Sequence, residues 1–272
     1  MDQLTPLDLQ GPITASPSQT PSTENKFKFP TEIVELPSKG LLYPEDHPLR
    51  NGTVELKYMT AKEEDILTNL NYIKQGLVID KLLQSLIVPK FNYDDLLVGD
   101  KNAIMIAARV LGYGKDYTFT YEGEEYTVDL SLLNTIELDE SLLIEPGVNE
   151  LKYTLPFSKN EITFCLLTGQ IEKSIDAEIK GIKRINKNAS PELSTRLKHQ
   201  ILSINGETDQ KTIRDFIDNF MLAKDSSAFR SYLKTISPDI KLVFVHEANN
   251  SEEEVAIPVQ VQFFWPDARI QG

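Results

Sequence analysis

One order of elements occurs twice along the chain, and it constrains the fold more than any single motif. In each half a strand-like run leads into a helix that opens on a threonine, further helical segments follow, and a hairpin closes the half. Thr60 opens the first such helix after the run 53–59, and Thr168 opens the second after the run 161–167. Alternating apolar residues predict strands, and apolar residues three and four apart predict helices. The pattern predicts an α+β fold of two tandem related units, each a strand, a helical cluster and a β-hairpin.

The first half contains specific start and stop signals. Glu63 follows Thr60 by three residues, which is the spacing of a capping box. Helices are predicted over about 77–88 and from Asp100 to a stop at Gly112. The segment 116–133 alternates aromatic and polar residues around Glu122 and Gly123, so it predicts a hairpin with its turn at this pair.

In the second half, apolar spacing predicts one helix over 213–221 and another over 228–236, which Pro238 ends. A second hairpin is predicted over 240–264. Its last strand is expected to run through the aromatic end, and Pro258 marks it as an edge strand. The residues expected on one face of that strand are Val255, Ile257, Val259, Val261, Phe263 and Trp265.

The 272 residues divide into four predicted segments. Residues 1–28 are rich in Pro, Ser and Thr and cannot bury enough apolar surface to offset their ordering entropy, which predicts a flexible and extended N-terminal arm. Residues 29–52 form a proline-rich hook. The first α+β unit is expected over 53–150, and the second, with an aromatic C-terminal strand, over 151–272.

Composition restricts the classes of partner. Acidic residues outnumber basic ones 41 to 28, a net charge of −13. Such a surface repels phosphate backbones and anionic lipid, so neither nucleic acid nor a membrane is expected as a partner. The N-terminus has no basic cap before an apolar core, and no run approaches about 18 apolar residues, which predicts a cytoplasmic protein or part of a particle assembled in a cytoplasm.

No set of residues has the spacing of a catalytic or metal site. His47, His199 and His246 are scattered, and none has a second ligand at metal spacing. Cys165, the single cysteine, lies in an apolar run and is interpreted as a buried thiol. The glycines of 111–117 lack a phosphate-loop ending. We therefore expect no enzyme, no cofactor and no metal. The basic run KGIKRINKN over 180–188 is interpreted as a solvated helix face, with contact to an acidic partner as the alternative.

Two stretches stand out as candidate contact surfaces. The central stretch of the hook, VELPSKGLLYPEDHPL over 34–49, has three prolines and a Lys-Gly pair suited to a tight turn, so the hook is pre-shaped for docking. Its apolar residues could pack on the strand 53–59 or on a neighbouring protein. The aromatic end FFWP could fill the core or bind a partner, because aromatics are enriched at interfaces. The candidate interface residues are Pro37, Lys39, Gly40, Leu41, Tyr43, Phe264, Trp265 and Pro266.

Several segments, in order, resemble the T-even-type phage baseplate hub family. They are LPSKGLLYP, VELKYMTAKEEDIL, AARVLGYGKDY, LLTGQIEK, ILSINGETDQKTIRDFIDNFMLAKDSSAFRSYL, ISPDI and FFWPD, and they span 36–267. That family is linked with assembly of the central hub of contractile phage tails. The resemblance implies a structural protein of the baseplate, present in the virion and in the host cytoplasm during assembly. Its implied partners are other baseplate and tail proteins (hub, wedge or tube-initiator subunits).

Two alternatives stay open beside this reading. A transient hub-assembly chaperone, absent from the mature virion, would carry the same resemblance. An envelope-degrading hydrolase would need a carboxylate pair or a metal site, and no spacing suggests one. Many relatives in the family carry a Cys-x-x-Cys knuckle inside one or both hairpins, whereas TYEGEEY and VHEANNSEEEV here contain no cysteine. This departure argues against zinc, and packing between side chains is expected to stabilise the hairpin tips instead.

Overall fold

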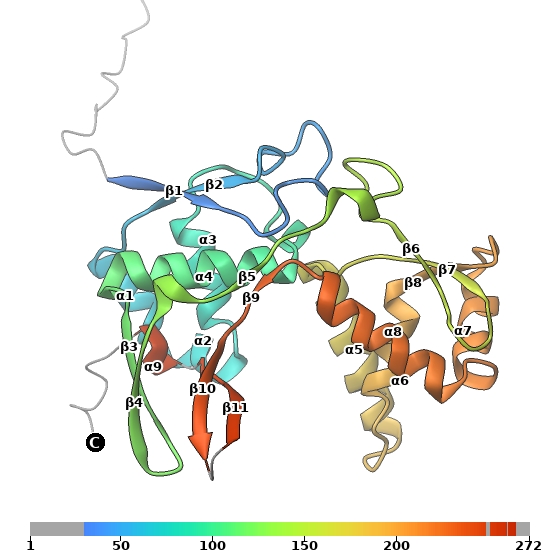
Figure 1. The fold of residues 1–272 in the computed structure, drawn as a ribbon. Coiled ribbons are helices and arrows are strands. Elements are labelled where there is room, and N and C mark those ends of the chain that lie inside the picture. Colours follow the sequence, from blue (N-terminus) through green and yellow to red (C-terminus); the bar gives the residue numbers. More distant parts are fainter. Residues whose placement is uncertain (1–29, 249–250, 260, 265–272) are drawn as a thin grey trace, which may run out of the picture.

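The structure is a computed structural model that describes residues 30–248, 251–259 and 261–264 (Figure 1). The arm predicted over 1–28 lies outside the described residues. The elements are β1 (Thr31–Glu35), β2 (Thr53–Lys57), α1 (Ala61–Leu67), α2 (Leu70–Gln75), α3 (Val78–Leu86), η1 (Tyr93–Asp95), α4 (Val98–Tyr113), β3 (Asp116–Tyr121), β4 (Glu124–Asp129), η2 (Leu130–Leu132), β5 (Thr135–Ile136), η3 (Glu140–Leu142), β6 (Leu151–Thr154), β7 (Glu161–Phe164), α5 (Gly169–Ile185), α6 (Glu192–Gln200), β8 (Ile201–Ile204), α7 (Gln210–Asn219), α8 (Ala223–Ile236), β9 (Asp239–Ile240), β10 (Val243–Ala248), β11 (Ser251–Ala256) and α9 (Val261–Phe264).

The α+β class is confirmed, because helices alternate with small antiparallel sheets throughout the described residues. Figure 1 shows two lobes. The first lobe holds β1 to β5 with α1 to α4, and the second lobe, residues 151–238, holds the sheet β6-β7-β8 with α5 to α8. After the second lobe the chain pairs β9 with β5, Thr135 opposite Ile240, and returns to the first lobe.

Local signals account for the first lobe. The capping box at Thr60 is confirmed: the Thr60 N–H and hydroxyl both donate to the Glu63 carboxylate, at 3.1 and 2.6 Å. Leu82, Leu83 and Leu86 are buried on one face of α3, as their three-and-four spacing predicts. Helix α4 continues through Gly112 and ends at Tyr113, so the stop is Gly114 with φ +83° rather than the predicted Gly112.

The second lobe packs its three-stranded sheet against α8. The rings of Phe164 on β7 and Phe229 on α8 are fully buried, with centroids 5.0 Å apart in an edge-on arrangement. Aromatic pairs favour this geometry because the ring edge is electropositive and the ring face electronegative. Thr168 caps α5 by accepting from the Ile171 N–H at 3.4 Å, as predicted from the strand before it.

The predicted aromatic C-terminal strand is wrong. Strand β11 ends at Ala256, and 261–264 form the short helix α9. Pro258 lacks the N–H that a continuing ladder needs. Phe263 and Phe264 are both buried rather than alternating between two faces, and the Phe263 ring packs edge-on against Tyr117, 4.9 Å between centroids. The two phenylalanines are therefore core residues.

The two hairpins lie side by side, although they are far apart in the sequence (Figure 1). The Phe244 ring of β10 lies 4.9 Å from the Phe119 ring and 5.0 Å from the Tyr126 ring of the first hairpin. The Tyr126 hydroxyl and His246 Nδ1 are 3.1 Å apart, within hydrogen-bond distance. Aromatic packing and this polar contact join the hairpins, so the second hairpin packs against the first lobe.

Candidate functional site

The hook folds back on itself in a tight turn. Lys39 and Gly40 both have positive φ, +54° and +73°, a region that suits glycine far better than other residues. A Cβ on Gly40 would lie 2.3 Å from the Arg50 carbonyl oxygen, so only glycine fits. Arg50 Nη1 donates to the carbonyls of Gly40, Leu41 and Tyr43, at 3.0 to 3.3 Å. One guanidinium thus holds the loop closed.

The turn is bound to the first lobe through Asp100, a fully buried carboxylate in the first turn of α4. Asp100 accepts from the Ser38 N–H at 3.0 Å, the Ser38 hydroxyl at 2.6 Å and the Tyr43 hydroxyl at 2.7 Å. The Tyr43 hydroxyl in turn accepts from the Leu97 N–H at 3.1 Å. We call this set, Ser38, Tyr43, Leu97 and Asp100, the Asp100 clasp. It fixes the hook to α4 across more than fifty residues of sequence.

Burial dominates the electrostatics of the clasp. It raises the pKa of Asp100, and the hydrogen bonds from Ser38 and Tyr43 counter this only in part. The pKa of Tyr43 is raised well above its usual range, first by burial and then by the Asp100 charge. The tyrosine therefore stays protonated and remains a donor. A carboxylate at a helix N-terminus also gains from the helix dipole.

The structure places the predicted interface residues as follows. Pro37, Gly40 and Tyr43 are buried within the chain, and Leu41 is half-buried. Lys39 is exposed and pairs with Glu137 at 2.6 Å. Phe264 is buried beneath the first lobe, while Trp265 and Pro266 lie outside the described residues. The hook thus packs on its own chain, and of its predicted interface residues Lys39 has an exposed side chain.

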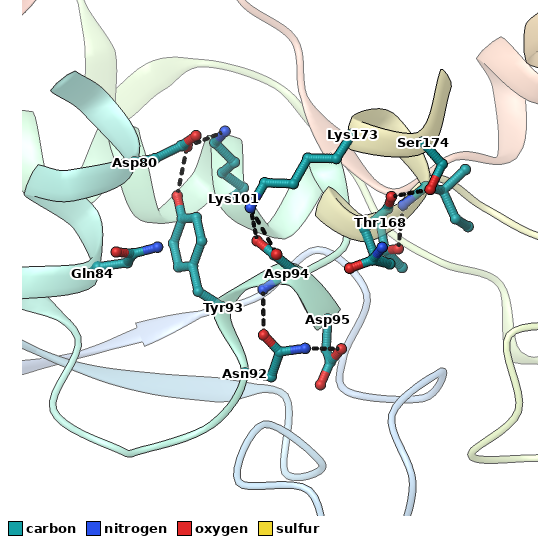
Figure 2. A network of polar contacts seen from close by, with 12 residues as sticks. Asp80, Gln84, Asn92, Tyr93, Asp94, Asp95, Lys101, Thr168, Lys173 and Ser174 are labelled. Carbon is teal, nitrogen blue, oxygen red and sulfur yellow. Dashed lines mark hydrogen bonds and ion pairs between the residues drawn. The ribbon is translucent and has the colours of Figure 1, made fainter. Parts of the chain in front are cut away.

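A polar network joins the lobes where α5 meets η1 (Figure 2). Lys173 of α5 pairs with both Asp94 oxygens at 2.6 and 2.7 Å. The Gly169 N–H donates to the Leu96 carbonyl at 2.9 Å, so the backbone shares the contact. Nearby, Asp80 pairs with Lys101 at 2.5 Å and accepts from the Tyr93 hydroxyl at 3.0 Å. These contacts set the start of α5 against the first lobe.

A pocket of about 540 Å³ opens beside this network. We call it the α2–α4 pocket. Its walls are mostly apolar, with Asp80, Lys101 and Asn102 as the polar members. The apolar lining comes from α2, α3, α4 and the base of the second hairpin: Ile73, Val78, Ile79, Met105, Leu242 and Val259. Pockets of this size and composition accept apolar side chains or small ligands.

Several other titratable residues make structural contacts. His47 stacks on Tyr43, and His199 contacts the Glu178 carboxylate at 2.9 Å. Arg214 binds both oxygens of Glu178 at 2.8 Å and, with His199, lowers the pKa of that carboxyl to about 2. Burial raises the pKa of the Cys165 thiol to about 11, as expected for a core residue. Within the described residues no His, Cys, Asp and Glu side chains group as metal ligands.

Sequence reasoning missed a set of exposed apolar side chains on the second lobe. Phe157, Phe220 and Leu222 are exposed, and Ile185 at the end of α5 is 91 % exposed. Ile185 lies inside the basic run 180–188, which forms the last turns of α5 and the loop after it, as interpreted from sequence. The sequence signal that could have identified this exposed residue is an isoleucine flanked by basic residues at the end of a predicted helix.

Comparison with known proteins adds no relative: no protein-family model matches the chain, and no curated protein or solved structure does either. Among the described residues no helix is both long and apolar enough to span a bilayer.

Proposed function

We propose that the chain is a structural protein of a phage contractile-tail baseplate, in its hub region, and that it acts through protein contacts during assembly. The observation that carries the proposal is the ordered set of segments across 36–267 that resembles the baseplate hub family. On this proposal the protein is not an enzyme. Its partners are other baseplate and tail proteins, without nucleic acid or membrane, and its locations are the virion and, during assembly, the host cytoplasm.

The positions of those segments support the proposal. The segment LPSKGLLYP supplies Ser38 and Tyr43 to the Asp100 clasp on α4. The segment LLTGQIEK supplies Gly169 and Lys173, which contact Leu96 and Asp94 at the joint between the lobes. Two of the segments quoted for the resemblance thus contact the same stretch of chain, 94–100, from opposite lobes.

We also propose that the chain arose as two tandem related units. In both halves a threonine caps a helix directly after a strand: Thr60 follows β2 and Thr168 follows β7. Both halves end in a hairpin, and the hairpins pack together through Phe244 and Tyr126. Contact between the two hairpins is consistent with two duplicated units that pack together through their terminal hairpins.

Mass spectrometry of purified mature tails tests the proposal against its alternative, a transient hub-assembly chaperone. A component is present in finished tails at a fixed ratio to hub proteins. A chaperone co-purifies with hub proteins from infected-cell extracts and is missing from finished tails. If the protein binds no hub or tail protein in either sample, the baseplate assignment is wrong. Cryo-electron microscopy of the tail tip then gives copy number and neighbours.

A further inference from the structure

The end of α5 is an exposed cationic projection. Ile185 is 91 % exposed, and Lys180, Arg184 and Lys187, close to it in the sequence, occupy exposed positions. In the described part of the chain none of these three cations forms an ion pair, while Lys183 pairs with Glu192. We call Ile185 with Lys180, Arg184 and Lys187 the α5 tip. An isoleucine that is 91 % exposed buries almost no apolar surface, so it contributes little to the stability of the monomer.

The α2–α4 pocket has the opposite properties. It is a concave apolar site of about 540 Å³ on the first lobe. Helix α2 beside it presents Leu70, 68 % exposed, and Ile73, which also lines the pocket. Exposed apolar residues next to a pocket are typical of grooves that receive a helix. The pocket is lined by α2, α3 and α4. Figure 1 shows these helices in one lobe and α5 in the other.

Charge is unevenly divided between these lobes. The second lobe, 151–238, has 14 basic and 10 acidic residues, whereas the remainder of the sequence has 14 basic and 31 acidic residues. One end of the molecule is therefore weakly cationic and the rest strongly anionic. Two tips placed together would repel each other, while a tip beside the anionic lobe of another copy is attracted.

We infer that the α5 tip of one copy inserts Ile185 into the α2–α4 pocket of a second copy, in a head-to-tail contact. The contact is heterologous, since it joins two different surfaces. Each copy then offers one free tip and one free pocket, so further copies add in the same way and form a ring or a chain. This inference concerns the purified chain and does not depend on the proposed baseplate function.

Sedimentation velocity of the purified full chain tests the contact over a micromolar concentration series. The sedimentation coefficient should rise with concentration in about 50 mM salt and fall back in about 500 mM salt, where the attraction is screened. Ile185→Asp and Ile73→Lys should each weaken association by at least about tenfold, because each places at the apolar contact a charge that the facing lobe repels. Phe220→Asp and Ile33→Lys alter exposed apolar residues elsewhere on the two lobes and should leave association unchanged.

Mixing the two defective variants gives the sharper test. Ile185→Asp keeps a normal pocket and Ile73→Lys keeps a normal tip, so their mixture should form one-to-one dimers that do not grow further. A wild-type chain that stays monomeric at every concentration would overturn the inference. So would an Ile185→Asp variant that associates like wild type, or a mixture that stays monomeric while wild type associates.

Discussion

Removing one hydroxyl from the Asp100 clasp should destabilise the first lobe far more than its size suggests. In Tyr43→Phe the ring remains and two buried hydrogen bonds are lost, to Asp100 at 2.7 Å and from the Leu97 N–H at 3.1 Å. A bond to a charged group contributes about 1.5–3 kcal/mol, and a buried N–H left without a partner costs about 1–3 kcal/mol. Since such terms are not fully additive, we expect a loss of about 3 kcal/mol in the free energy of unfolding.

The matched control is Tyr72→Phe on α2. Tyr72 is partly buried, and its hydroxyl makes no hydrogen bond within the described part of the chain. Its loss should change the free energy of unfolding by less than about 0.5 kcal/mol. Urea unfolding followed by far-ultraviolet circular dichroism measures both variants. Hydrogen-exchange mass spectrometry adds a local readout, because the Leu97 amide should exchange faster in Tyr43→Phe alone.

The penalty should also depend on pH. Burial raises the folded-state pKa of Asp100 above its unfolded value of about 3.9. Its contribution to stability is therefore full below about pH 4 and is lost as the pH rises through the folded pKa. The Tyr43 hydrogen bond lowers this pKa and offsets part of the loss, so Tyr43→Phe should cost most at neutral pH and least in acid. Equal effects of Tyr43→Phe and Tyr72→Phe at neutral pH would refute the reasoning.

Three further predictions concern other parts of the chain. Gly40→Ala should prevent stable folding of the first lobe, since the new Cβ would lie 2.3 Å from a carbonyl oxygen. Gly76→Ala, at a position with φ +68° and open space around the new Cβ, should cost only about 1 kcal/mol. Thermal denaturation of the two variants measures the difference. Phe244→Ala should cost about 3–5 kcal/mol by emptying the aromatic cluster between the hairpins, and the exposed Val245→Ala should cost little in the same urea assay. Because the pKa of Glu178 is lowered in the folded state, wild type should lose stability as the pH falls from about 4.5 to about 2. Glu178→Gln should abolish this pH-dependent loss, and melting temperatures measured across that pH range test it.

Local signals predicted local structure well. The capping box at Thr60 and the hairpin turn at Glu122 and Gly123 were both predicted from residues a few positions apart, and both are confirmed. The aromatic end was mispredicted as a strand. Pro258 interrupts the hydrogen-bond ladder, and the short apolar run after it is equally compatible with a helical turn, which 261–264 form. Short apolar runs leave this ambiguity, and only packing against α4 resolves it.

By itself the sequence determined many of the helices and the turn of the first hairpin, because caps, turns and apolar spacing act over a few residues. It also determined the net charge and the basic run that contains Ile185. Only the tertiary structure decided that Asp100 binds the hook and that the second hairpin joins the first, since both contacts link residues far apart in the chain. The same holds for the α2–α4 pocket, whose walls come from three helices and the base of a distant hairpin. Long-range contacts depend on how whole helices and strands pack against one another, and that packing cannot be predicted from the residues within a few positions of each contact.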